Sequence, residues 1–260
     1  DVDGAIALDH VDGLEFAGRL ITDAREGDEL PGAIYQNLVQ TRSAQLLRDN
    51  PGRYVLVAIP CQLEGLYNYI RQHEPGLRDR IHTTIGLLCG WQYSHHSINA
   101  ISKFNGIDPE RIADISYRGG GPIGRLTITT DDNESHSVNR RVNFGYQVAF
   151  DRHMNTTRCH LCVNHGNFLA DIVVGDAWLP NTLRSRTGVS LVVCRTPATT
   201  ELVQALVARD RVVTAAATTD EIRLSQKDRV AHGDFAYAYA AYLDEIGQHH
   251  PDMTGPNRGV

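Results

Sequence analysis

Residues 53–61 read RYVLVAIPC, an apolar run that ends in a proline and a cysteine. An unbroken apolar run of this length is typical of a strand buried on both faces, the kind found in parallel sheets. The residues after it place apolar side chains at helical spacing, at Leu63, Leu66, Tyr67 and Ile70. The sequence therefore predicts a strand followed by a helix, with Cys61 at the corner between them.

A second corner of the same kind is predicted at Cys89. The apolar run over residues 83–88 ends there, and a helix is expected over residues 94–104. The carboxyl ends of parallel strands lie along one edge of an α/β sheet, where ligands bind. We therefore expect Cys61 and Cys89 to lie close together, although they are far apart in the sequence.

The character of the sequence changes between Ile112 and Val142. Three short alternating segments, over residues 112–117, 126–130 and 135–142, are separated by turn-forming residues, which predicts an antiparallel β insertion. Further strands are predicted over residues 3–8, 170–174 and 189–195, and further helices from Thr199 and over residues 235–246. The predicted fold class is α/β, with a mixed sheet, flanking helices and an inserted antiparallel β segment.

We divide the chain into two parts that are expected to form one compact unit. Residues 1–110 form the amino-terminal α/β part of a catalytic domain, and residues 111–260 hold the β insertion, a CxxC loop and a Gly-Asp-Ala-Trp loop. Because the first residue is Asp1 and a buried strand is already predicted from Asp3, we also expect a truncated amino terminus.

Composition excludes several classes of protein. The 260 residues are 42% hydrophobic, enough to bury a substantial core. The formal net charge is -6 and the basic residues are dispersed, so nucleic acid is not an expected partner. No apolar run approaches the roughly 20 residues that span a bilayer, and the amino terminus lacks the order of a signal peptide. We expect no membrane insertion and a cytoplasmic location.

Five cysteines in a chain of this size favour thiol or metal chemistry over a disulfide framework. Cys159 and Cys162 form a closely spaced pair in a polar loop. Their spacing alone leaves a zinc site, a redox dithiol, an iron-sulfur cluster and a structural pair open. The dithiol is disfavoured, because such pairs usually begin a helix after a strand, whereas this pair precedes a strand.

Two ligand sets compete for the metal. Zinc could take Cys159, Cys162 and His165, with Cys61 or Cys89 as the fourth ligand. The two cysteines at the strand ends complete a set of four thiolates more economically. Cys194 lies inside an apolar strand, where a cysteine is more often a core residue than a ligand.

At these residues the chain resembles the beta-subunit family of coenzyme F420-reducing hydrogenases and dehydrogenases. The likeness runs over nearly the whole chain and is carried by Asp3–Ile6, Pro60–Gln62, Ile85–Cys89, Tyr117–Gly120, Cys159–Cys162, Ala170–Trp178 and Gly188–Val192. It implies a 4Fe-4S cluster held by Cys61, Cys89, Cys159 and Cys162. It also implies bound FAD and an external electron or hydride carrier, of the deazaflavin F420 or the ferredoxin type.

Residues that could touch the cofactors flank these motifs. Gly175 permits close approach of a planar ring, while Asp176, Ala177 and Trp178 follow it in a loop where the acid and the indole could bond and stack. A plain turn with a core tryptophan is the alternative. Arg118 and Gly119 could meet a phosphate, although a β-turn with a surface arginine explains them better. Pro60 and Gln62 flank Cys61, and Gln62, Gly90 and His160 are candidates for contacts around a cluster.

The preferred function is an iron-sulfur flavoprotein oxidoreductase, and two alternatives stay open. One is a zinc-stabilised or metal-free accessory protein of surface-polysaccharide biosynthesis. The other, a thiol nucleophile at Cys61, is disfavoured because no ordered base adjoins that residue and the other cysteines would be unexplained. The expected partner is an electron carrier or a redox subunit, in a homo- or hetero-oligomer.

Overall fold

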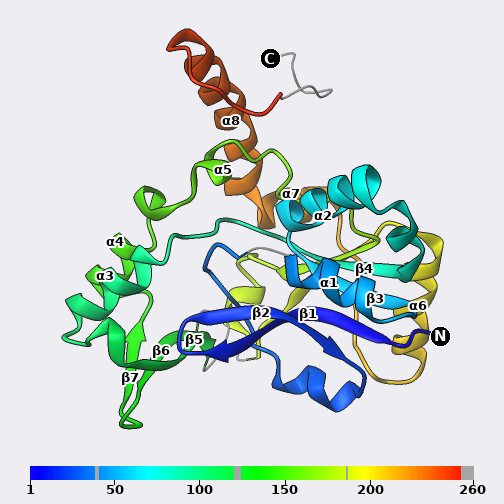
Figure 1. Ribbon diagram of the computed structural model, residues 1–260, viewed down its shortest axis with the longest axis horizontal. Helices are drawn as coiled ribbons and strands as arrows, with labels where there is room; N and C mark the ends of the chain where they lie inside the picture. Colours follow the sequence, from blue (N-terminus) through cyan, green and yellow to red (C-terminus); the bar gives the residue numbers. More distant parts are fainter. Residues whose placement is uncertain (39–40, 120–123, 186, 253–260) are drawn as a thin grey trace.

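The main layer of the protein is a six-stranded mixed sheet in the order β2-β1-β3-β4-β8-β9 (Figure 1). The computed structural model describes residues 1–38, 41–119, 124–185 and 187–252. Four neighbouring strands are parallel, namely β1 (Gly4–Asp12), β3 (Tyr54–Ala58), β4 (Ile81–Leu87) and β8 (Ile172–Asp176). The edge strands β2 (Glu15–Ile21) and β9 (Ser190–Cys194) run antiparallel to them. The predicted mixed α/β sheet is confirmed.

Eight α-helices and five 3-10 helices lie among the described residues. The α-helices are α1 (Thr41–Asp49), α2 (Pro60–His73), α3 (His96–Phe104), α4 (Phe144–Ala149), α5 (Thr157–His160), α6 (Pro197–Ala208), α7 (Thr219–Ser225) and α8 (Lys227–Glu245). The 3-10 helices are η1 (Ala24–Glu29), η2 (Pro75–Arg80), η3 (Pro109–Arg111), η4 (Arg152–Met154) and η5 (Thr182–Arg184). In Figure 1, α8 projects away from the sheet, beyond α5.

Helix α2 illustrates how the sequence forms the first corner. Pro60 occupies its first turn, where the fixed φ of proline suits a helix and the missing N–H breaks no bond. Gln62 Oε1 accepts a hydrogen bond from the Ile59 N–H at 3.3 Å. The apolar side chains Leu63, Leu66 and Ile70 are buried against the sheet, in one core with Leu56 and Val173. The predicted helix and its buried face are therefore confirmed.

The β insertion forms a second, smaller sheet. Strands β5 (Ile112–Gly119), β6 (Arg125–Thr130) and β7 (Ser135–Asn139) pair antiparallel in that order. Asn133 has a φ of 64° in the turn between β6 and β7, a conformation that asparagine tolerates well. A separate core, with Ile98, Ile101 and Leu126 among its members, fills the space between this sheet and α3. The predicted insertion is confirmed, although β7 ends before the predicted residue 142.

Some boundaries differ from the predictions. Helix α8 begins at Lys227 rather than near residue 235, and β8 extends to Asp176. Gly175 and Asp176 therefore belong to a strand, paired with Leu191 and Ser190 of β9, and not to a loop. The reason is tertiary, because the neighbouring strand supplies partners that the local sequence does not reveal. The division at residue 110 stays a prediction, while β8 and β9, from the second part, complete the main sheet.

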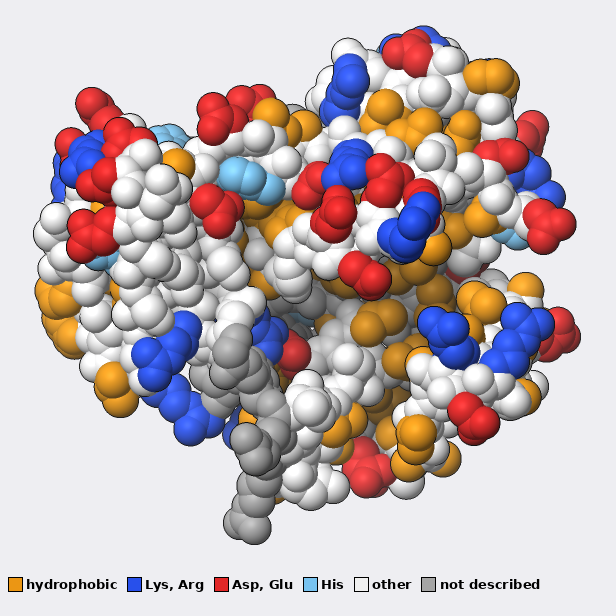
Figure 2. Space-filling model, turned by 90° about the horizontal axis from the view of Figure 1, so that it is seen from below, with side chains coloured by type: hydrophobic (Ala, Val, Ile, Leu, Met, Phe, Trp, Pro, Cys, Tyr) orange, Lys and Arg blue, Asp and Glu red, His pale blue; other side chains and the backbone are white. Residues whose placement is uncertain are grey.

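Charge is mixed over the face of the molecule seen in Figure 2. Basic and acidic side chains are interspersed there, and hydrophobic side chains lie in the hollowed middle of that face. Within the part of the chain that the structure describes, no helix is both long and apolar enough to cross a bilayer.

Candidate metal and cofactor site

Four cysteines line one small cavity at the carboxyl edge of the main sheet. Cys61 lies in the first turn of α2, just after β3, and Cys89 lies just after β4, the parallel neighbour of β3. Cys159 lies in α5, and Cys162 follows that helix. The cavity has a volume of about 20 Å³, and its other lining residues are Pro60, Gly90, Gln92, Arg158 and His165. The structure thus brings the two strand-end cysteines together with the CxxC pair.

A buried asparagine holds the CxxC loop against both corners. Asn167 is 0% exposed, and its Nδ2 donates to Ala58 O at 2.9 Å and to Leu87 O at 3.3 Å. These carbonyls end β3 and β4, so one side chain joins the two strands whose following residues carry Cys61 and Cys89. Asn167 was not predicted from the sequence, because a lone asparagine in a polar loop carries no distinctive signal.

Hydrogen bonds also connect Cys89 and Cys159 with the residues around them. The Cys89 N–H donates to His165 O at 3.3 Å, and His165 Nδ1 lies 2.8 Å from Cys89 O. Cys159 Sγ accepts hydrogen bonds from the Gln92 N–H and from Thr156 Oγ1, both at 3.3 Å. Amide donors to a cysteine sulfur are a feature of sites that stabilise negative charge on metal-bound thiolates.

Burial makes two thiols of this cavity, those of Cys61 and Cys162, harder to ionise in the metal-free protein. Burial, together with the nearby Cys159 and Cys162, raises the pKa of Cys61 to about 11, while Arg158 opposes the rise. Burial also raises the pKa of Cys162. Thiolates are the form that binds metals, so loading this site must release protons and is favoured as the pH rises.

The four thiols of the cavity match the ligand set of a 4Fe-4S cluster in number and in type. Within the described ranges, no three or more His, Cys, Asp or Glu side chains are placed so that they could hold a single metal ion. A single zinc would need its sulfur ligands at about 2.3 Å from one centre. A 4Fe-4S cluster takes four thiolates, each on a different iron, and so accepts a wider arrangement. The number and the type of the donors are compatible with that group.

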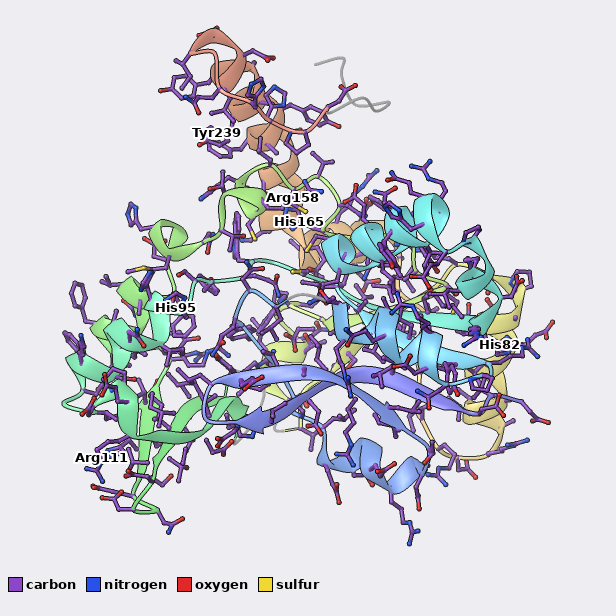
Figure 3. All side chains as sticks on the ribbon, viewed as in Figure 1. His82, His95, Arg111, Arg158, His165 and Tyr239 are labelled. Carbon is purple, nitrogen blue, oxygen red and sulfur yellow. The ribbon has the colours of Figure 1, made fainter. Side chains whose placement is uncertain are left out.

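Aromatic and histidine rings form a cluster between α8 and the residues of the cysteine cavity. The Trp91 ring centroid lies 4.3 Å from that of His232, 6.0 Å from that of His165 and 6.2 Å from that of His160. His232 is 4% exposed, and its Nε2 lies 2.8 Å from Cys159 O. Figure 3 shows Arg158 and His165 close together at the base of α8. Trp91 and His232 were not predicted from the sequence, because α8 is distant along the chain and His232 belongs to no ligand motif.

An ion pair links the two helices on either side of the cysteines. Arg158 of α5 donates from Nη2 to Glu64 Oε2 of α2 at 2.7 Å. Because Arg158 also lines the cysteine cavity, this pair places a positive charge beside Cys61 and Cys162. Such a charge favours the ionised form of a thiol.

Two segments predicted separately as cofactor contacts meet in the structure. Arg118, at the end of β5, donates from Nη1 to Asp176 Oδ2 at 2.5 Å, and its guanidinium lies 5.6 Å from the centroid of the Trp178 ring. Trp178 is 38% exposed, so it is not a core residue. Its backbone N–H donates to Ser225 Oγ at 3.0 Å, while Gln226 Nε2 donates to Asp176 O at 2.9 Å. Helix α7 and the residue after it therefore position this loop.

Gly175 and Gly119, the glycines predicted as cofactor contacts, have different surroundings in the structure. A Cβ at Gly175 would lie 2.6 Å from Leu88 Cβ, so glycine is needed there for strand packing. Gly119 ends β5, beside Arg118. The rest of the predicted anion loop, Gly120 and Gly121, lies outside the described residues.

A larger cavity of about 450 Å³ lies between α1 and α2. It shares Cys61 and Gln92 with the cysteine cavity, and Gln62 also lines it. The volume falls in the range of small-molecule sites, roughly 300 to 1,000 Å³. No local pattern in the sequence indicates this cavity, because it depends on the distance between two helices.

Residues 52–220 match the family model that describes the carboxy-terminal part of the coenzyme F420 hydrogenase/dehydrogenase beta subunit. Among solved structures, the chain is similar to one chain of the F420-reducing [NiFe] hydrogenase complex from Methanosarcina barkeri. The two are 15% identical with a TM-score of 0.68, and the likeness covers 96% of this chain and 84% of that chain. At this identity the likeness supports the fold alone. Comparison with curated proteins finds no match.

Proposed function

The chain belongs to the coenzyme F420 hydrogenase/dehydrogenase beta-subunit family, and from this premise we propose that it is an iron-sulfur flavoprotein oxidoreductase. Family membership itself suggests oxidoreductase activity. One observation carries the finer proposal: four cysteines from two strand ends and one CxxC loop line a single cavity. In this proposal Cys61, Cys89, Cys159 and Cys162 hold a 4Fe-4S cluster.

The surroundings of the cysteines suit a redox centre. The Gln92 N–H and Thr156 Oγ1 donate to the Cys159 sulfur, and donors of this kind raise the reduction potential of a cluster. Trp91 packs against the buried His165 and His232, and His165 lines the cysteine cavity. The protein would thus control the potential through hydrogen bonds and burial.

FAD is the second cofactor that we propose, and when bound it would convert between hydride chemistry and single-electron transfer. Contacts with it are proposed for Pro60, Gln62, Arg118, Gly119, Gly175, Asp176, Ala177 and Trp178. Arg118 pairs with Asp176 and its guanidinium lies over the Trp178 ring, which is 38% exposed. A partly exposed indole is suited to stack on a planar ring.

Replacing Trp178 by alanine is expected to weaken FAD binding about fivefold, because a stacked aromatic pair contributes about 1 kcal/mol beyond its buried area. Fluorescence titration of FAD measures the change. Trp178→Phe, which keeps a ring, should bind within twofold of the parent and is the matched control. Equal binding by Trp178→Ala and the parent would remove the stacking role.

The proposed carrier is a deazaflavin of the F420 type or a ferredoxin-type protein. A cluster held by Cys61, Cys89, Cys159 and Cys162 would supply single-electron chemistry, whereas a hydride from a deazaflavin carries two electrons and a proton. We also propose a cytoplasmic location, where thiols stay reduced. The similar Methanosarcina chain comes from a hydrogenase complex, and by analogy a redox subunit is the proposed partner.

Purification without oxygen tests the cofactors directly. The protein should contain about four irons and four acid-labile sulfides per chain, together with bound FAD. Iron, sulfide, zinc and flavin are each measured on one preparation. Zinc without sulfide or flavin would overturn the proposal and favour an accessory protein without redox activity.

A further inference from the structure

Helix α8 carries a row of large apolar side chains along the part that projects from the sheet (Figure 1). This row, the α8 stripe, consists of Phe235, Tyr239, Tyr242 and the C-cap residue Ile246. Its spacing of four, three and four residues is that of a coiled-coil contact, and at about 3.6 residues per turn the four side chains share one side of the helix. Phe235 is 45% exposed, Tyr242 52% and Ile246 50%. A continuous exposed apolar row of this kind indicates a surface that another protein covers.

The rings of the stripe are ordered, and they start beside the cysteine cavity. The Phe235 and Tyr239 rings are stacked with their centroids 5.8 Å apart, and Tyr239 is stacked with Tyr242 at 6.2 Å. Figure 3 shows Tyr239 on the projecting part of α8. The His232 ring lies 5.8 Å from that of Phe235 and 4.3 Å from that of Trp91. A partner on the stripe would therefore lie next to the ring cluster of the cysteine site.

The two edges of the α8 stripe differ. Along one edge, small and apolar side chains are buried against Leu161, namely those of Ala236, Ala240 and Leu243. The other edge carries Asp234 and Glu245, both exposed, at about 80 to 100° around the helix from Phe235 when each residue turns about 100°. The chain itself thus covers one edge of the stripe, and the edge that remains open to a partner is acidic.

Charge selects the kind of partner. Residues 232–252 include four acidic residues, Asp234, Asp244, Glu245 and Asp252, and no lysine or arginine. Two copies of this chain paired through the stripe would bring acidic edges together, which like-charge repulsion disfavours. A complementary surface needs lysine or arginine beside an apolar row. Because the row has coiled-coil spacing, a helix presents such a surface in the matching geometry.

We propose that a basic amphipathic helix of a redox subunit docks along the α8 stripe. This proposal rests on the proposed function, which supplies the redox role of the partner. The apolar row of the partner helix would cover Phe235, Tyr239, Tyr242 and Ile246, and its basic residues would face Asp234 and Glu245. Docking there holds the subunit beside Trp91 and His232, at the side of the cysteine site that faces α8.

A synthetic helix serves as the probe. The peptide has about three heptads, with leucine at both contact positions and lysine at the flanking positions, and its acidic counterpart has glutamate in place of lysine. Fluorescence anisotropy measures the binding of each labelled peptide to the full chain, purified without oxygen, with iron and flavin measured on the same preparation. The variants are Tyr242→Ala and Glu245→Lys. Lysine at a helix carboxyl terminus suits the helix dipole, so Glu245→Lys is expected to fold.

Matched controls come from other helices. Phe144, at the start of α4, is an aromatic residue that is 68% exposed, and Glu201 of α6 is an exposed acid. Phe144→Ala and Glu201→Lys remove the same kinds of group as the two test variants, but away from the α8 stripe. Circular dichroism on every variant separates loss of binding from loss of the fold.

The basic peptide is expected to bind the parent, and the acidic peptide is not. Tyr242→Ala should weaken binding at least tenfold, because buried aromatic anchors dominate helical interfaces. Glu245→Lys should weaken it about fivefold and reduce its salt dependence, as the loss of an edge charge does. Both control variants should bind within twofold of the parent.

Four results would overturn the proposal, and they separate it from the proposed function. Equal binding by the parent, Tyr242→Ala and Glu245→Lys would show that the peptide binds elsewhere. A parent that dimerises, and loses this in Tyr242→Ala, would assign the stripe to a second copy. An iron-loaded parent that does not bind the basic peptide removes the docking surface but leaves the proposed function standing. A parent that binds the peptide but lacks iron and flavin overturns the proposed function, and with it the redox role of the partner.

Discussion

Replacing Cys159 by serine is expected to abolish the cluster, lowering iron from about four to less than one per chain. The thiolate is the ligand that iron requires, and a serine hydroxyl keeps its proton at neutral pH. Cys159 also anchors the site, because it accepts the Gln92 and Thr156 hydrogen bonds and its carbonyl oxygen lies 2.8 Å from His232 Nε2. Iron, acid-labile sulfide and the visible spectrum measure the loss. Serine at Cys61, Cys89 or Cys162 should have the same effect.

The fifth cysteine provides the matched control. Cys194 ends β9, and its Sγ lies 3.5 Å from Thr199 O, away from the cysteine cavity. Cys194→Ser should therefore keep about four irons per chain. Circular dichroism on every variant separates loss of the cluster from loss of the fold. A Cys159→Ser protein that retains its full iron and sulfide would refute the ligand assignment.

In the metal-free protein at pH 8, Cys61 is expected to react with iodoacetamide about 100-fold more slowly than an unperturbed thiol. Burial raises its pKa from 9.0 to about 11, and each pKa unit lowers the thiolate fraction about tenfold at a pH below both values. The labelling rate should rise about tenfold per pH unit until the pH nears 11. Mass spectrometry of the peptide that carries Cys61 measures that rate.

The pH dependence distinguishes ionisation from simple shielding. A thiol that is merely covered would label slowly with a pH profile centred near 9, whereas the raised pKa moves the midpoint to about 11. Protein unfolded in urea is the control, since its thiols return to ordinary pKa values. A midpoint near 9 in the folded protein would show that burial does not act on Cys61 in this way.

The raised pKa of Cys61 also determines how the stability of the metal-free protein changes with pH. Because the folded-state pKa of Cys61 is raised, its protonated form contributes stability that is fully present below pH 9 and is lost as the pH rises toward 11. The metal-free protein should therefore become less stable over this interval. Bound metal would reverse the sign, since it takes the thiolate.

The sequence alone determined the local framework of the protein. The strand-to-helix corners at Cys61 and Cys89 and the β insertion follow from apolar runs, helical spacing and turn residues, which are properties of neighbouring residues. The segment with the CxxC pair was predicted as a loop, but Cys159 lies in the short helix α5. The parallel order of the strands then explains why two distant cysteines meet at one edge of the sheet. Strand β2 and helix α1 were missed.

Only the tertiary structure decided what surrounds that framework. The contacts of Arg118 with Trp178 and of Trp91 with His232 join segments far apart in the chain, and the cavity between α1 and α2 depends on how two successive helices pack. No local pattern specifies such distances, because they depend on how complete helices and strands pack against one another. The sequence thus determined which cysteines reach the sheet edge, and packing decided which rings, charges and spaces lie around them.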